Sequence, residues 1–402
     1  MSAFVLLLQM GHLRRCAFFF PNKGHRLSGA LSGGALALTL LSALRLVHAQ
    51  GGVVPFPSAL PSAPTAILVP ASTIRLTGAV DSNSPAIWDL SAGRTLLYMF
   101  TSWGGQPSLA TGTGLTRLGA AEQIGLSPVP PGGSWIEAVV KDEGGIFYGY
   151  YHNERVATVC PGSDKVIPRV GALRSADRGE TWEDLGIILE APPGSFDCET
   201  TNRFLVGGVG DFSVMLDADS TDLYFFFSQY ERSDRFQGVA IARMSWADRD
   251  EPMGKVTVWN SGVWLAARAF VARGRDATPI IRWVYRAATP VYPAAEPWHD
   301  DDTVVDAFWG PSVHWNTYLQ QYVMLLNKAK DSDWNEEGIY VAFAPRLDDP
   351  ELWSTPVKIL DGGSWYPQVM GLEAGTGTDK VAGEWARLFI TGRSSYLIHF
   401  VK

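Results

Sequence analysis

The sequence has 402 residues, of which 46% are hydrophobic and 18% are charged, and a formal net charge of −8 at pH 7. These values indicate a folded globular protein. The acidic balance, without any Lys/Arg cluster, excludes nucleic acid as the expected partner. The 41 Gly and 25 Pro residues favour many short strands joined by turns.

The N-terminal segment has the layout of a secretory signal. Basic residues up to Arg26 precede an apolar, small-residue run at 27–46, and Ala49 ends an A-x-A-like cleavage site before Gln50. We therefore expect a signal peptide at 1–49 and a secreted or periplasmic protein. The alternative is an uncleaved signal anchor, through which alone the protein would contact a membrane.

Residues 50–72 are rich in Pro, Ala and Ser and predict a linker or an arm on the surface. From residue 73 to 402 a four-strand pattern recurs, without convincing helices. The short first strands are expected at 84–88, 135–139, 211–215, 311–315 and 366–370. Aromatic second strands are expected at 96–100, 147–151, 223–227, 322–326 and 386–390.

Five such units predict an all-β fold, a five-bladed β-propeller with four-stranded antiparallel blades at 73–402. The fifth unit stops at its third strand, 395–400, so we expect an N-terminal strand near 73–79 to complete this blade and close the ring. The segment 265–306 fits the repeat poorly. We interpret it as a long loop in preference to a degenerate sixth blade, because no pair of first and second strands is recognisable in it.

Two cysteines, Cys160 and Cys198, lie in linking segments of the predicted propeller. In an oxidising compartment this even pair predicts a disulfide. Two unpaired buried thiols are the alternative. No Cys/His spacing indicates a zinc site.

Residues 175–182, with the sequence SADRGETW, resemble the Asp-box turn of sialidases and related propellers, S-x-D-x-G-x-T-W. We expect a hairpin turn in which Asp177 accepts amide hydrogens, Gly179 takes a positive φ and Trp182 packs between strands. The resemblance implies a propeller and, by itself, no particular chemistry.

The repeat region as a whole resembles the five-bladed glycosidases of the arabinanase and β-xylosidase clan. The five-blade count and the acidic residues at the starts of innermost strands carry this resemblance. It implies one Asp at the head of the first blade, matched by Asp81, and a second at the head of the third, matched by Asp211. It also implies a Glu at the head of the fourth blade, where the chain instead has Trp309 followed by Gly and Pro.

In a propeller, first strands begin, second strands end and third strands begin on one face, so the residues at these positions should crowd together. The candidate catalytic carboxylates on that face are Asp81, Asp211, Glu137 and Glu337. The candidate substrate-binding residues are Asn83, Trp103, Trp135, His152, Arg169, Tyr230, Trp309, His314, Trp365, Tyr366 and Arg393. Aromatic rings stack on sugar rings and polar side chains bind hydroxyls, so the set favours an oligo- or polysaccharide as partner.

Several of these residues also have a purely structural interpretation. Trp309 and Trp365 could wedge between blades, His152 could cap a turn and Asp211 could cap a neighbouring loop. His314 lies one step further along its strand, where it could line the channel and hold a water or a metal. The sequence indicates no required cofactor. It leaves open whether a calcium ion binds in the channel.

These observations favour a secreted glycoside hydrolase. Asp81 would be the base or nucleophile and Glu137 or Glu337 the acid, while Asp211 would tune the pKa of that acid. A non-catalytic carbohydrate-binding propeller is the main alternative, and the missing Glu of the fourth blade supports it. A sialidase-like exo-glycosidase and a protein-interaction scaffold are further alternatives. The four carboxylates must converge on one pocket if the first hypothesis is right.

Overall fold

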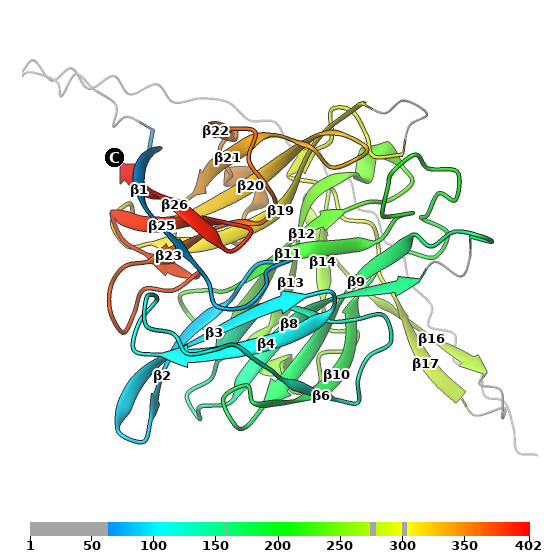
Figure 1. Ribbon diagram of the computed structural model, residues 1–402. Coiled ribbons are helices and arrows are strands. Elements are labelled where there is room, and N and C mark those ends of the chain that lie inside the picture. The colour runs from blue at the N-terminus through cyan, green and yellow to red at the C-terminus, as the bar shows by residue number, and fades with distance from the viewer. Residues whose placement is uncertain (1–62, 157–159, 274–278, 300–303) are drawn as a thin grey trace, which may run out of the picture. The chain divides into compact units, whose positions relative to one another are not determined.

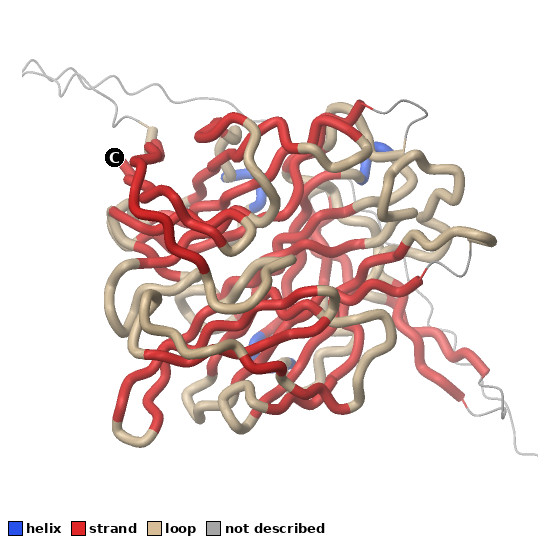
Figure 2. Tube along the Cα trace, viewed as in Figure 1, coloured by secondary structure: helices blue, strands red, loops and turns tan. Residues whose placement is uncertain are grey.

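The computed structural model describes residues 63–156, 160–273, 279–299 and 304–402. Their strands form five main sheets arranged around a central axis (Figure 1), and Figure 2 shows how little helix the described chain contains. The predicted all-β, five-bladed propeller is therefore confirmed, and with it the architecture that the resemblance to five-bladed glycosidases implied. The predicted signal peptide at 1–49 lies outside the described residues.

The first blade contains β2 (Ala86–Ser91), β3 (Arg94–Trp103), β4 (Gln106–Gly112) and β5 (Glu122–Gln123). The second contains β7 (Trp135–Lys141), β8 (Phe147–Val156), β9 (Val166–Ser175), β10 (Thr181–Leu189) and the parallel strand β6 (Gly125–Ser127). The third contains β11 (Val209–Leu216), β12 (Asp222–Gln229), β13 (Gly238–Ser245), β14 (Thr257–Asn260) and β15 (Val263–Ala266), with β18 (Tyr292–Pro293) beside β13.

The fourth blade contains β19 (Val304–Asn316), β20 (Gln321–Asp331), β21 (Glu336–Ala344) and β22 (Val357–Asp361), with β24 (Val381–Ala382) beside β19. The fifth contains β23 (Pro367–Gly371), β25 (Trp385–Ile390), β26 (Arg393–Val401) and β1 (Thr65–Arg75). Short 3-10 turns occur at η1 (Asp234–Phe236), η2 (Trp246–Asp248) and η3 (Pro350–Leu352). Within the described chain, no helix combines the length and apolar character that a membrane span requires.

Strand β12 shows why the second strands of the sequence pattern are continuously apolar. Phe225 and Phe227 pack toward the second blade, in one core cluster with Tyr150, whereas Tyr224 and Phe226 pack in another cluster with residues of the fourth blade. Both faces of the sheet are buried, so alternate residues of the central part of the strand serve opposite interfaces and are apolar on both. The rows of buried aromatic residues hold neighbouring blades together.

The ring is closed by β1, the blue strand that lies beside the red β26 in Figure 1. Thr65 pairs with Val401 and Arg75 with Arg393 in an antiparallel ladder. The predicted closure by an N-terminal strand is therefore confirmed. The strand begins at Thr65 and not near 73, so residues 65–72 of the predicted linker or arm belong to the fifth blade.

The segment 265–306 contains a separate hairpin, β16 (Arg268–Arg273) and β17 (Pro279–Val284), which Figure 1 shows projecting from the third blade. Trp283 and Tyr285 anchor the base of the hairpin against the core of that blade. In the described part of this segment no further four-stranded sheet occurs, which agrees with the loop interpretation.

The β9–β10 turn has the geometry expected for residues 175–182. Asp177 accepts hydrogen bonds from the amide of Thr181 (2.9 Å) and the hydroxyl of Ser175 (2.7 Å), and Gly179 has a φ of 90°. The indole of Trp182 is buried and donates to the Gly179 carbonyl over 3.0 Å. Arg178 in this turn pairs with Asp89 of the first blade over 2.7 Å, so the turn connects the two blades.

Cys160 and Cys198 form a disulfide, as predicted. Beside it, Val166 exchanges backbone hydrogen bonds with two residues of the following excursion, donating to Phe204 O (2.9 Å) and accepting from Val206 N (3.1 Å). The disulfide and these bonds tie the excursion between the second and third blades to β9. They fix the position of Phe204, which lies at the site described next.

Candidate active site

A pocket of about 220 Å³ opens on the face where the innermost strands begin. Its lining comes from all five blades and from the excursion before β11, and consists of Asp81, Trp135, Glu137, His152, Glu154, Phe204, Leu205, Asp211, Trp309, Trp334, Trp365 and Tyr366. The face predicted from propeller topology therefore exists. Three of the four predicted carboxylates, Asp81, Glu137 and Asp211, converge on it together with five of the predicted binding residues.

Two of these carboxylates stand on β-bulges of the innermost strands. In β7, Ile136 pairs with Tyr151 and Ala138 with Tyr150, which leaves Glu137 as the extra residue. In β11, the register shifts in the same way between Gly210 and Phe212 around Asp211, whose φ is 45°. A bulge adds one residue to a strand, and the side chain of that residue leaves the regular alternation between the two faces of the sheet. It explains how acidic residues within apolar strands reach the pocket.

Asp211 is held by two phenols from different blades. Tyr230 donates its hydroxyl to Oδ2 over 2.6 Å, and Tyr366 donates to Oδ1 over 3.1 Å. Burial raises the pKa of Asp211, while His152 and the two hydroxyls favour the ionised form and limit the increase. The predicted capping of a neighbouring loop is not the role observed, since these contacts come from blades three and five.

Glu137 is almost completely buried and accepts a hydrogen bond from the amide of Phe212 over 2.8 Å. Burial raises its pKa well above the usual range, and the charge of Asp211 adds to the effect. Oxygen atoms of Glu137 and Asp211 lie within 4.8 Å of each other. Two carboxylates so close cannot both ionise easily, so Glu137 is the one disposed to keep a proton.

His152 lies between the carboxylates. The amide of Asp211 donates to Nδ1 over 3.0 Å, and Nε2 faces Glu154 Oε1 at 3.4 Å. Burial lowers the pKa of His152, but Glu154, Asp211 and Glu137 outweigh it and raise the pKa to about 9. The adjacent Gly210 is required, because a Cβ there would lie 2.5 Å from the imidazole.

Asp81 lies in the loop that leads into the first blade and is less buried than the other two predicted carboxylates. Its amide donates to the Ser102 carbonyl over 2.8 Å, which fixes the loop against β3. Burial raises the pKa of Asp81, a hydrogen bond from Trp135 lowers it, and the charges of Asp211 and Glu154 raise it further. Asp81 is therefore the carboxylate best placed to meet a ligand directly.

The opposite wall is aromatic. Trp365 donates its indole N–H to the Trp334 carbonyl (2.9 Å), and Trp309 packs edge-on against Trp334 with ring centres 4.7 Å apart. Phe204 contributes a ring that is 36% exposed, seated against Trp334 and Trp365. The predicted wedging of Trp309 and Trp365 between blades is thus compatible with a place in the pocket lining.

The sequence pattern did not identify Glu154, Phe204, Leu205 and Trp334. Glu154 could have been found, because it stands two residues after His152 on the same face of β8. Trp334 lies in the β20–β21 turn with a φ of 63°, and Phe204 lies in an irregular excursion. Neither position could be predicted from the two-residue periodicity of a strand.

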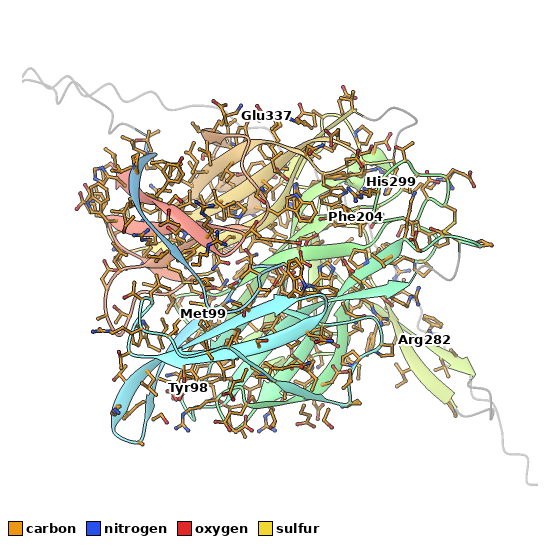
Figure 3. The ribbon with its side chains drawn as sticks, viewed as in Figure 1. Tyr98, Met99, Phe204, Arg282, His299 and Glu337 are labelled. Atoms are coloured by element: carbon orange, nitrogen blue, oxygen red, sulfur yellow. A yellow bond between two sulfur atoms is a disulfide. The ribbon has the colours of Figure 1, made fainter. Side chains whose placement is uncertain are left out.

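The structure does not bring Glu337 to the pocket. Its carboxylate binds Lys358 and accepts from the Tyr340 hydroxyl (2.6 Å), and Figure 3 shows it at the periphery, well apart from Phe204. The preceding residue, Glu336, points inward and accepts from the Trp309 indole over 3.2 Å. Successive side chains of a strand point to opposite faces. A prediction displaced by one residue therefore exchanges the inward-pointing carboxylate of Glu336 for the outward-pointing one of Glu337.

Six predicted binding residues also lie outside the pocket lining, and one of them, His314, is described separately below. Asn83 donates to the carbonyls of Phe212 and Pro311 and so ties the first blade to the third and fourth. Arg169 donates to Asn153 and faces a different cavity. Trp103 and Arg393 are exposed at strand turns. The remaining one, Tyr230, stands behind Asp211 and acts on the pocket through it.

His314 is fully buried, with its ring 5.5 Å from that of Phe400 in the fifth blade. Burial and the charge of Lys380 lower the pKa of His314 to about 3, so the ring is neutral. The ammonium of Lys380 binds Ser213 Oγ (2.9 Å) and pairs with Asp379 Oδ2 (3.2 Å). Calcium prefers six to eight oxygen ligands. A lysine paired with the buried Asp379 beside a histidine does not fit a calcium ion.

Glu137, His152 and Asp211 have the composition of a metal-binding group. Each of them, however, already accepts a hydrogen bond from the protein. The donors are the amides of Phe212 and Asp211 and the hydroxyls of Tyr230 and Tyr366. In this structure the three side chains are therefore engaged in hydrogen bonds to the protein.

No protein-family model matches the sequence, and no curated protein matches it. Among solved structures, the chain is similar to an endo-arabinase from Bacteroides thetaiotaomicron, with 10% identity, a TM-score of 0.45 and coverage of 84% of this chain and 97% of that one. It is similar to an exo-β-1,3-galactanase from Phanerochaete chrysosporium (14% identity, TM-score 0.43, coverage 82% and 64%). It is also similar to an α-L-arabinofuranosidase from Lactobacillus brevis (13% identity, TM-score 0.42, coverage 79% and 90%).

Proposed function

We propose that the protein is a glycoside hydrolase whose chemistry resides in Asp81, Glu137 and Asp211. The observation that carries the proposal is that these carboxylates, from three different blades, meet in one pocket with an aromatic wall. Glycosidic cleavage needs one carboxylic acid to protonate the leaving oxygen and one carboxylate to activate water or attack the anomeric carbon. Aromatic rings supply the surface on which a sugar ring stacks.

Glu137 is the proposed acid. Its burial and the nearby charge of Asp211 both favour the protonated form. The amide of Phe212 holds one of its oxygens, which leaves the other to carry the proton toward the pocket. A carboxylic acid kept neutral by burial and a neighbouring charge is the usual way in which an enzyme retains a proton donor near neutral pH.

Asp211 is the proposed tuning residue and is not the partner that activates water. One of its oxygens lies within 4.8 Å of one oxygen of Glu137, which is closer than the roughly 6.5–9.5 Å that leaves room for an activated water between acid and base in inverting enzymes. Hydroxyl donors on both of its oxygens favour its ionised form. Its negative charge then raises the pKa of the acid.

Asp81 is the proposed base or nucleophile. It is the least buried of the three and lies at the entrance to the first blade, so its carboxylate can reach a bound sugar or a water molecule. Its charge is not neutralised by any Lys or Arg among the residues that line the pocket.

A non-catalytic carbohydrate-binding propeller is the second candidate. The observation in its favour is that Glu137 and Asp211 already accept hydrogen bonds from protein groups. Buried carboxylates satisfied in this way also serve as purely structural elements. The two candidates differ in whether turnover occurs at all.

The test is hydrolysis of a panel of aryl glycosides and polysaccharides by the purified protein and matched variants. Asp81→Asn and Glu137→Gln should each lower kcat by about 10²-fold or more, the range expected for loss of a positioned acid or base. Glu337→Gln makes the same chemical change outside the pocket and should leave kcat unchanged. Binding of sugars without turnover of any substrate would support the second candidate. Equal activity of all variants would refute the proposed roles.

We also propose that the protein is exported, on the basis of the signal-like segment at 1–49. N-terminal sequencing of protein recovered from the medium or periplasm should begin at Gln50. An intact N-terminus in the membrane fraction would contradict cleavage.

A further inference from the structure

The charges that line the pocket are of one sign. Four of the lining residues are carboxylates, Asp81, Glu137, Glu154 and Asp211. The one basic side chain among them, His152, is already surrounded by three of these carboxylates. Among the residues that line the pocket there is no Lys or Arg. The pocket therefore offers no partner for a negative charge on a ligand.

The walls add to this asymmetry. Six of the lining residues are aromatic, namely Trp135, Phe204, Trp309, Trp334, Trp365 and Tyr366. The face of an aromatic ring carries the negative part of its quadrupole, so it attracts cations as well as the C–H face of a sugar. Rings and carboxylates together form a surface that favours positive charge and disfavours negative charge.

The four carboxylates are not equally available to a ligand. Glu137 and Asp211 are engaged by protein donors, as described above. Glu154 is one-third exposed, and its contact with the ring of His152 is long, at 3.4 Å. Glu154 also interacts electrostatically with Asp81, so the two lie near the same part of the pocket. A positive group on the ligand would meet Glu154 and Asp81 first.

The size of the pocket limits what it can hold. Its volume of about 220 Å³ is below the roughly 300–1,000 Å³ of sites that enclose a drug-sized molecule. One sugar ring is therefore the largest unit that it can enclose.

We infer that the pocket selects a single terminal sugar by charge, preferring a ring that carries an ammonium group to the neutral ring and excluding a ring that carries a carboxylate. The inference rests on the proposed function in assuming that the pocket binds carbohydrate. An acidic ring would lose its hydration and face like charges without any compensating cation. An amino sugar would place its ammonium beside Glu154. The inference also separates this pocket from that of a sialidase-like enzyme, whose substrate carries a carboxylate.

The test compares sugars that differ only in charge. Galactosamine, galactose and galacturonate form one series and glucosamine, glucose and glucuronate a second, so that ring stereochemistry is matched within each. Affinity is measured by titration calorimetry or saturation-transfer NMR at about pH 6, where an amine of this kind is protonated. In the series that binds better, the amino sugar should bind at least about 5-fold more tightly than the neutral sugar, the effect of about 1 kcal/mol of ion pairing. The uronate should bind at least about 10-fold more weakly.

Two controls make the result specific. Glu154→Gln should reduce the preference for the amino sugar over the neutral sugar, whereas Glu337→Gln, the same change outside the pocket, should leave it unaltered. In the wild-type protein, added salt should reduce the same preference, because ion pairing in a solvent-accessible pocket is screened. This second measurement does not depend on the folding of a variant.

The outcomes distinguish this inference from the proposed function. Equal binding of the uronate and the neutral sugar, or an amino sugar that binds no better than the neutral one, overturns the charge selection even if the protein hydrolyses glycosides. Failure of all six sugars to bind overturns both. The expected order without any hydrolysis supports charge selection in a binding protein.

Discussion

Tyr366, just before the innermost strand of the fifth blade, donates its hydroxyl to Asp211 of the third blade across 3.1 Å, although 155 residues separate them in the sequence. Tyr366 also lines the pocket, whereas Tyr230, which holds the other oxygen of Asp211, stands behind it. Packing of the fifth blade against the third therefore contributes to keeping Asp211 ionised. The two tyrosines provide a matched pair for testing its role.

Asp211→Asn keeps the shape of the side chain and removes its charge. If Asp211 tunes the acid, hydrolysis should fall by about 10²-fold or more, while the protein still folds. Tyr366→Phe and Tyr230→Phe each remove one hydrogen bond to a charged group and should each cost about 1.5–3 kcal/mol of stability. Only Tyr366→Phe should also change KM. An unchanged rate in Asp211→Asn would exclude Asp211 from the catalytic set.

The dependence of rate on pH should be bell-shaped. If Asp81 is the base and Glu137 the acid, activity requires Asp81 ionised and Glu137 protonated, so the rate rises as pH passes the pKa of Asp81 and falls as pH passes that of Glu137. Burial raises both pKa values, and that of Glu137 more strongly. Because the two groups interact within one pocket, the apparent pKa values of the two limbs belong to the coupled pair and not to either residue alone. Glu137→Gln should abolish the alkaline limb in the residual activity. Retention of that limb would assign the acid to another group.

The free energy of unfolding should fall as pH rises from the pKa of Glu336 in the unfolded chain to its pKa in the folded protein. Burial raises the pKa of Glu336 to about 8 in the folded protein, against about 4.3 in the unfolded chain. Between these values the folded state holds the extra proton, so each pH unit removes up to about 1.4 kcal/mol of stability. Glu336→Gln should therefore flatten the decline in melting temperature between about pH 5 and 8. Glu337→Gln, a half-exposed neighbour with a lowered pKa, should not.

The disulfide should contribute to both stability and ligand affinity. Cys160 and Cys198 are 38 residues apart, and opening a loop of this size should cost about 3–4 kcal/mol in the chain-entropy model. The double variant to Ser should also weaken sugar binding, because the excursion that carries Phe204 loses one of its ties. The prediction fails if reduction leaves melting temperature unaltered while free-thiol titration shows complete opening.

Calcium should have no effect on the protein. Neither added calcium nor a chelator should shift the melting temperature, because Lys380 supplies the positive charge beside Asp379. Lys380→Met leaves Asp379 buried without its cation and should destabilise the fold by about 3–5 kcal/mol. A rise in the melting temperature of the wild-type protein with calcium would show that a metal site exists after all.

The blade count and the shared face follow from the sequence because both rest on short-range order. Alternation along strands such as β12 and the spacing of turns are local properties, and topology then dictates which strand ends meet. That reasoning correctly gathers Asp81, Glu137, Asp211 and His152.

The remaining parts of the site depend on irregular backbone, which has no period. The pattern indicates Glu337, whereas Glu336 is the residue that points inward, because nothing local fixes the register of β21 to within one residue. Phe204 and Trp334 reach the pocket from an excursion and a turn. Their positions depend on the disulfide and on packing of tryptophan against tryptophan, as between Trp298 and Trp334, whose rings stack 4.1 Å apart.

The pairing of β1 with β26 also constrains the order in which the protein can fold during synthesis. The ribosome makes β1 before the other described strands and β26 after all of them, so β1 waits without its partner while four blades are produced. During that interval the edges of the incomplete ring are open to pairing with other chains. Tyr366 joins Asp211 only when the fifth blade is added, so the pocket is not fully assembled until the last blade is in place.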